Sequence, residues 1–144
     1  MKDKVSLSKG NLLSYRTEIK SNFSDKDVVI DEIRSFLLSN SVSIQLDAFE
    51  LRLVLDEAIS NAIEHGNRFS STKKVIIKVT VREDVVEINV KDEGIGFEFE
   101  DIFLDFSANT VRRRGRGLKI IKKFAKIQWD EIGNEINLEV ERTY

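Results

Sequence analysis

The sequence predicts an α+β fold, a two-layer sandwich in which helices cover one face of a mixed, mainly antiparallel sheet. Three segments repeat apolar residues at helical spacing, and four of five predicted strands form two pairs joined by short turns. No internal repeat or low-complexity linker divides the chain of 144 residues. We therefore expect a single domain over residues 1–144, with residues 1–10 loose at its start.

The N-terminal part is predicted to form a strand and then a helix. Leu13–Ile19 is the predicted strand. Ser24 followed by Asp27 is a capping pattern that begins a helix ending near Asn40. The apolar positions of this helix recur at i, i+4, i+7 and i+8, and they are Val29, Ile33, Phe36 and Leu37.

A second capping pattern, Asp47 with Glu50, predicts another helix, which Gly66 ends. Its apolar stripe consists of Leu51, Val54, Leu55, Ala58 and Ala62. Two alternating runs then predict a hairpin of Val75–Arg82 and Val85–Lys91. One face of its first strand is apolar, with Val75, Ile77, Val79 and Val81.

The C-terminal part is predicted to form a helix and a second pair of strands. The apolar face of this helix contains Leu118, Ile121, Phe124 and Ala125. The strands are Ile127–Glu131 and Glu135–Glu141, joined at Gly133-Asn134. The second of them alternates Ile136, Leu138 and Val140 with polar or charged neighbours.

Composition narrows the classes of function. A net charge of -2 provides no general attraction to nucleic acid. The absence of cysteine excludes disulfides, thiolate metal sites and a cysteine nucleophile, and the single His65 excludes a cluster of histidine ligands. No segment approaches the roughly 20 apolar residues of a membrane span, and no signal-peptide core follows Met1. We expect a soluble cytoplasmic protein that binds neither nucleic acid nor membrane.

Three motifs in a fixed order carry the functional signal. In the first, Asp56–Asn67, Glu57 and Asn61 are separated by four residues, so they lie about 40° apart on one helix face and can reach a common ligand. The second, Asp92-Glu93-Gly94-Ile95-Gly96, follows a predicted strand. The third, Gly115-Arg116-Gly117-Leu118, precedes a predicted helix. Together they predict a nucleotide site.

The chemistry of the motifs suits different parts of a nucleotide. Asp92 can accept a hydrogen bond from the exocyclic amine of adenine, which guanine lacks at that position. Gly94 and Gly96 allow the backbone to come close to base and ribose. Gly115 and Gly117 precede a helix N-terminus, where free amides and the helix dipole attract phosphate.

Four arginines near the third motif allow two interpretations. Arg112, Arg113, Arg114 and Arg116 place positive charge beside the expected phosphates. One of them can clamp the γ-phosphate, because arginine makes paired contacts to phosphate oxygens. For any single one of them, a solvated basic patch or a docking surface for an acidic partner is the favoured interpretation.

The three motifs resemble the N, G1 and G2 boxes of the GHKL superfamily of Bergerat-fold, histidine-kinase-like ATPases. The closer resemblance is to the branch of anti-sigma factor serine-protein kinases, for which Asp-Glu-Ala-x-x-Asn-Ala-x-x-His-Gly and Gly-Arg-Gly-Leu are typical, and it extends from about Phe23 to the C-terminus. It implies that Glu57 is the general base and that Asn61 is a magnesium ligand. His65 closes the N box and is expected to pack near the helix end. The residues that it implies for ATP binding are Asn61, Asp92, Gly94, Gly96, Arg114, Gly115, Arg116, Gly117 and Leu118.

The resemblance also implies a function and partners. We expect a bacterial anti-sigma-type regulator that binds ATP with Mg²⁺, sequesters a sigma factor or similar client and phosphorylates a serine or threonine of a small antagonist protein, as a homodimer. The alternative is a non-catalytic switch that binds ATP and sequesters its partner without phosphoryl transfer. The intact Glu57 argues against this alternative. A stand-alone sensor histidine kinase is disfavoured because the chain has no room for a pair of dimerisation helices.

Overall fold

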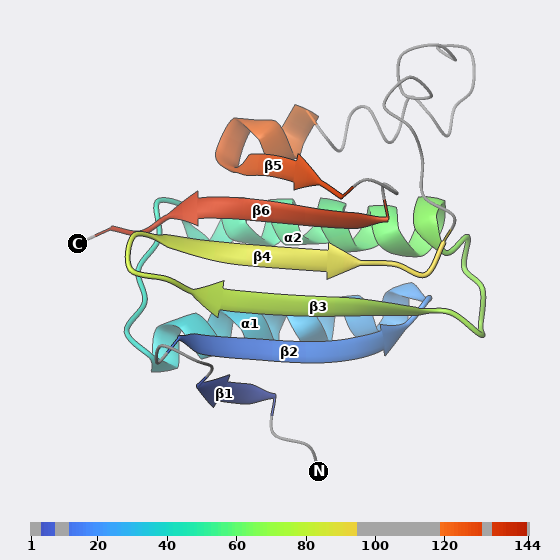
Figure 1. Cartoon of the computed structure of the whole chain (residues 1–144), viewed down its shortest axis with the longest axis horizontal. Helices are drawn as coiled ribbons and strands as arrows, with labels where there is room; N and C mark the ends of the chain where they lie inside the picture. The colour runs from blue at the N-terminus through green and yellow to red at the C-terminus, as the bar shows by residue number, and fades with distance from the viewer. Residues whose placement is uncertain (1–3, 8–11, 95–118, 131–133, 144) are drawn as a thin grey trace.

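The computed structural model of the chain describes residues 4–7, 12–94, 119–130 and 134–143. Within these residues six strands form one sheet in the order β1-β2-β3-β4-β6-β5, and each neighbouring pair is antiparallel. The helices α1 and α2 both lie against the same face of this sheet (Figure 1). The predicted α+β architecture, a mainly antiparallel sheet with helices on one face, is therefore confirmed.

The strands are close to those predicted, apart from the first. Their bounds are β1 Val5–Leu7, β2 Leu13–Lys20, β3 Lys74–Val81, β4 Val85–Lys91, β5 Lys126–Trp129 and β6 Glu135–Glu141. β1 lies in the stretch expected to be loose. It pairs with the start of β2, where Val5 is opposite Tyr15, and Lys4 beside it forms an ion pair with Glu32 of α1. Three residues are too few to show an alternating pattern, so this strand could not be predicted from periodicity.

The two helices have the predicted positions, but their ends differ in detail. α1 is Lys26–Ser39 and follows a 3₁₀ turn, Phe23–Asp25. Ser24 lies inside this turn and is not the cap, because its backbone N–H donates to Oδ1 of Asn22 (3.1 Å). α2 is Ala48–Asn61, and its predicted capping box is present.

The core lies between the sheet and the two helices. The predicted apolar stripes of α1 and α2 are buried, as is the predicted inner face of the hairpin. Figure 1 shows both helices running behind the central strands, which explains this burial. Fully buried side chains contributed by the sheet include Val75, Ile77, Val79, Val86, Ile88 and Leu138. Each such side chain stabilises the fold by about 1.5–3 kcal/mol relative to its exposed state.

The segment before β5 is helical over residues 119–124. Ile121 is fully buried, and Phe124 and Ala125 pack against the core, as predicted for one helix face. Leu118, the first expected residue of that face, lies outside the described residues. Among the described helices, none combines the length and apolar character that crossing a membrane requires.

Candidate functional site

Helix α2 places Glu57 and Asn61 one turn apart, as the sequence predicts. Both residues lie in its regular α-helical part and both are partly buried. The capping box at Asp47 and Glu50 determines where the helix begins. The apolar stripe of the helix determines which of its faces packs against the sheet. A rise of about 6 Å over four residues separates Glu57 from Asn61 along the axis, so both can contact one extended ligand.

A wider turn follows immediately after Asn61. Residues Ala62–Gly66 are π-helical, and the backbone N–H of Asn67 donates to the carbonyl of Ala62 (2.8 Å). His65 lies within this turn and is partly buried. Arg68 and Phe69, which follow Asn67, have left-handed backbone angles (φ 51° and 57°), which are costly for side chains of their size. π-Helical turns of this kind are frequent at functional sites.

The first two motifs pack directly against each other through glycines. A side chain on Gly66 would overlap the carboxylate of Asp92, and a side chain on Gly94 would overlap the carbonyl of Gly66. Asp92 follows β4, is only 7% exposed, and its Oδ1 accepts a hydrogen bond from the backbone N–H of Gly94 (2.8 Å). The end of the N-box helix therefore helps to position the Asp92 carboxylate.

Asn67 connects this region to the sheet, and the sequence did not predict its role. Its side chain is 1% exposed. Nδ2 donates to Oγ of Ser21 and to the carbonyl of Lys74, both at 2.8 Å, and Oδ1 accepts from the N–H of Glu93 (2.7 Å). Asn67 thus links the ends of β2 and α2 to the start of β3 and to the loop that carries Asp92. In the sequence, only its position directly after Gly66 could have indicated that Asn67 belongs to the site.

Asn61 and Asp92 line the same small cavity. The other lining residues are Ala58, Ala62, Val90, Trp129, Asn134 and Ile136. Apolar side chains with a few polar groups suit a heteroaromatic ring. The enclosed volume is about 10 Å³, close to that needed for one water molecule. A purine therefore requires neighbouring side chains to move apart when it binds.

Glu57, which is not among the residues that line this cavity, lies in a charged environment. Burial raises the pKa of Glu57 above its ordinary value; the negative charges of Asp56 and Glu64 raise it further, and the ammonium group of Lys26 opposes them. Nζ of Lys26 lies 2.8 Å from Asp56 Oδ1 and donates to Oγ of Ser60 (3.0 Å). A carboxylate with a raised pKa is a stronger base than an ordinary glutamate, which suits it to accept a proton.

Gly96, Arg114, Gly115, Arg116, Gly117 and Leu118 all lie outside the described residues. The described part of the site therefore comprises the first motif and the beginning of the second, together with Trp129 of β5 and Asn134, which directly precedes β6.

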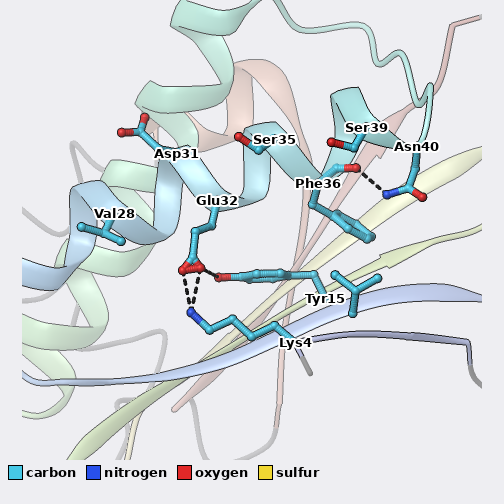
Figure 2. A pocket seen from close by; sticks show the side chains of 10 residues that line it. Lys4, Tyr15, Val28, Asp31, Glu32, Ser35, Phe36, Ser39 and Asn40 are labelled. Atoms are coloured by element: carbon cyan, nitrogen blue, oxygen red, sulfur yellow. Dashed lines mark hydrogen bonds and ion pairs between the residues drawn. The ribbon is translucent and has the colours of Figure 1, made fainter. Parts of the chain in front are cut away.

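A larger cavity of about 530 Å³ lies elsewhere, between β1, β2 and α1 (Figure 2). None of the predicted site residues lines it. Figure 2 shows Lys4 and Tyr15 converging on Glu32: Lys4 Nζ lies 2.7 Å from Glu32 Oε2, and the Tyr15 hydroxyl donates to the same oxygen (3.3 Å). Burial and then the charge of Glu32 raise the pKa of Tyr15. These contacts join β1 and β2 to α1, so we interpret this cluster as structural.

Comparison of the sequence with known protein families identifies the family of this chain. The pattern that defines the histidine kinase-like ATPase domain family matches residues 25–139. The chain belongs to this family. The match includes Glu57, Asn61, Asp92 and all the residues that line the small cavity. Membership of an ATPase-domain family implies that the chain binds ATP.

Relatives of this histidine kinase-like ATPase domain include anti-sigma F factors. That of Priestia megaterium is 39% identical over 79 residues, which are 52% of this chain and 54% of the relative. The anti-sigma F factor of Bacillus subtilis (strain 168) is 35% identical over 78 residues, which are 52% of this chain and 53% of the relative. The factor of Clostridium perfringens (strain 13 / Type A) is also 35% identical over 78 residues, 52% and 56% of the two chains. The chain thus matches about half the length of these relatives, and its resemblance to the anti-sigma branch is confirmed.

Proposed function

We propose that this chain is an anti-sigma-type regulator that binds ATP with Mg²⁺ and transfers the γ-phosphoryl group to a serine or threonine of a small antagonist protein. The observation that supports it best is that Asn61 and Asp92 line one cavity, with Glu57 one helical turn before Asn61. This arrangement supports Asp92 as the residue that reads the base, Asn61 as a metal ligand and Glu57, which lies outside the cavity lining, as the general base.

The described residues fit an adenine nucleotide. The Asp92 carboxylate is buried and fixed by Gly94, and it can accept a hydrogen bond from the adenine amine. Ala58, Ala62 and Ile136 provide apolar contacts for the two faces of the base. Guanine presents a carbonyl at the position of this amine, so it would place an acceptor against an acceptor.

The described residues also fit the phosphate groups of ATP. The carboxamide oxygen of Asn61 can hold Mg²⁺, which is commonly bound by one or two protein oxygens together with phosphate oxygens. Bound Mg-ATP supplies the transferable phosphoryl group and the charge neutralisation that its transfer requires. Glu57 then orients the incoming hydroxyl and accepts its proton, for which its raised pKa is suitable.

The proposed partners follow from the relatives and from the family resemblance. Proteins named anti-sigma F factors match half of this chain, which supports a sigma factor or similar client. We propose that the acceptor hydroxyl belongs to a small antagonist protein, as the resemblance implies. We propose that the chain acts as a homodimer, as the resemblance implies. The rival proposal, a switch that holds its partner without phosphoryl transfer, predicts the same binding but no phosphorylated product.

The pathway can be tested by co-purification. The tagged wild-type chain is used to retain proteins from the native cell extract with and without ATP, and mass spectrometry then identifies phosphoserine or phosphothreonine on retained proteins. Recovery of a sigma factor together with a phosphorylated small protein would support the proposal. Retention without phosphorylation would favour the non-catalytic switch, and phosphorylation of a small molecule with no retained protein would refute both.

We predict that the wild-type chain prefers ATP to GTP and that Asp92→Asn weakens ATP binding. Asparagine replaces one acceptor with a donor, so a buried amine is left badly paired, at a cost of about 1–3 kcal/mol. Calorimetry measures both affinities. The fluorescence of Trp129, the only tryptophan in the chain and a residue that lines the cavity, provides a second signal.

Asp84→Asn is the matched control for this measurement. Asp84 is exposed in the turn between β3 and β4, at the end of β4 opposite Asp92. The same substitution there should leave both affinities unchanged. Equal binding of ATP and GTP by the wild type, or undiminished ATP binding by Asp92→Asn, would remove Asp92 from the adenine site.

A further inference from the structure

We propose that a lysine-lined cavity, at the end of the sheet opposite the proposed ATP site, binds an acidic and partly apolar segment of a partner protein. This cavity has a volume of about 470 Å³. It shares no lining residue with the small cavity that contains Asp92. The inference therefore goes beyond the proposed phosphoryl transfer and does not depend on it.

The lysine-lined cavity and the proposed ATP site lie at opposite ends of strand β4. Val85, the first residue of β4, lines the lysine-lined cavity, and Asp92 directly follows the last residue of the strand. A strand of seven residues spans roughly 23 Å. In Figure 1, β4 runs across the middle of the sheet, starting at the end where β6 finishes. A partner in the lysine-lined cavity therefore does not occupy the cavity that contains Asp92.

Four lysines within eight residues supply the positive charge of this region. They are Lys119, Lys122, Lys123 and Lys126, and residues 119–129 include no acidic residue. All four lysines are exposed, and none forms an ion pair within the described part of the chain. The last three line the cavity. Their charge is therefore available to the carboxylates of a partner, although the net charge of the chain is -2.

Apolar side chains lie beside these ammonium groups. Ile121 is fully buried and Phe124 packs against the core, so the short helix is held to the fold by its apolar face and not by its lysines. Phe124 and Leu46 are only partly buried, and both line the cavity. A lining of this kind suits a protein segment that carries apolar residues as well as carboxylates.

Two carboxylates in the lining discriminate between kinds of anionic partner. Glu139 and Glu141 of β6 contribute to the same cavity. Lys126 is directly opposite Glu139 across the β5–β6 pair and offsets part of its charge. Both carboxylates repel the closely spaced charges of a nucleic-acid backbone. A peptide can instead place its acidic residues against the lysines and its apolar residues elsewhere, so a protein segment fits this cavity better.

Fluorescence anisotropy tests the inference with three labelled probes. They are a peptide rich in glutamate and leucine, its counterpart with glutamine in place of glutamate, and a single-stranded oligonucleotide. We expect the wild-type chain to bind the acidic peptide most tightly, and sodium chloride to weaken this binding. Lys122→Glu combined with Lys123→Glu should lower the affinity about three- to tenfold, the effect of reversing two exposed charge contacts. The ATP affinity of this variant, measured by calorimetry, should match that of the wild type.

Lys20→Glu combined with Lys78→Glu is the matched control, because it changes the net charge by the same amount. Both lysines are exposed, in β2 and β3, and neither lines the cavity. This control should bind the acidic peptide as the wild type does. If urea denaturation shows that the first variant is unfolded, Lys122→Gln combined with Lys123→Gln gives the same comparison with a smaller expected loss.

Three outcomes would overturn the inference. Equal losses in the variant and its control would reflect net charge alone. Equal binding of the acidic and neutral peptides by the wild type would show that the lysines do not select carboxylates, and tighter binding of the oligonucleotide would assign the cavity to nucleic acid. None of these outcomes affects the proposed ATP site, which the nucleotide calorimetry tests separately.

Discussion

Glu57→Gln is expected to lower phosphoryl transfer by roughly two orders of magnitude or more, the usual effect of losing a general base. Glutamine has nearly the same shape but cannot accept the proton of the incoming hydroxyl. ATP affinity should remain near that of the wild type, because Glu57 does not line the cavity that contains Asp92. The measurement is single-turnover transfer of labelled phosphate to the co-purified substrate, with calorimetry of ATP binding in parallel.

The pH profile provides a control for the same assignment. A base must be deprotonated to act, so the wild-type rate should fall as the pH drops through the raised pKa of Glu57. Asp56→Asn removes a charge that raises this pKa and should move the acid limb to lower pH, whereas Lys26→Met removes a charge that lowers it and should move the limb to higher pH. Transfer by Glu57→Gln at the wild-type rate, or shifts in the same direction for both charge variants, would contradict the role of Glu57.

Asn67→Ala is expected to lower the free energy of unfolding by about 2–4 kcal/mol, because it leaves several buried polar groups without partners. The carboxamide of Asn67 bonds to Ser21, Lys74 and Glu93, so all three contacts disappear together. Urea denaturation measures the loss. ATP binding should also weaken, since the loop that carries Asp92 loses one of its attachments.

Asn89→Ala is the control for stability. Asn89 is a partly buried asparagine in the central strand β4, on the face of the sheet opposite the core. Its replacement should cost less than about 1 kcal/mol, as is usual away from buried networks. If Asn67→Ala were no more destabilising than Asn89→Ala, the network around Asn67 would contribute little to the fold.

The sequence predicted those parts of the fold that depend on local periodicity. The alternation in Val75–Arg82 and the capping box at Asp47 and Glu50 were sufficient to locate β3 and α2, because strand burial and helix capping act over a few residues. The π-helical turn after Asn61 was not predictable in this way. Its hydrogen bonds depend on how the helix end packs against Asp92 and Gly94, which are distant in sequence.

The same distinction applies to the site. Glu57 and Asn61 were predicted together because their spacing is local, and Asp92 because it follows a strand. Asn67 was missed because its partners Ser21 and Glu93 are 46 and 26 residues away. Asn134 was missed because its relation to Asp92 arises only when β4 and β6 pair.

The short strand β1 has a practical consequence for anyone who shortens this chain. β1 is the edge strand on one side of the sheet. It pairs with β2, and the other side of β2 pairs with β3. Removing the first seven residues would expose the edge of β2 at Leu13–Tyr15, which β1 covers, and so extend the open edge over the full strand; it would also free Glu32 from Lys4. A long, exposed edge strand is a template for pairing with a strand of another molecule. An N-terminally trimmed version should therefore self-associate at high protein concentration, and tags are better placed at the C-terminus.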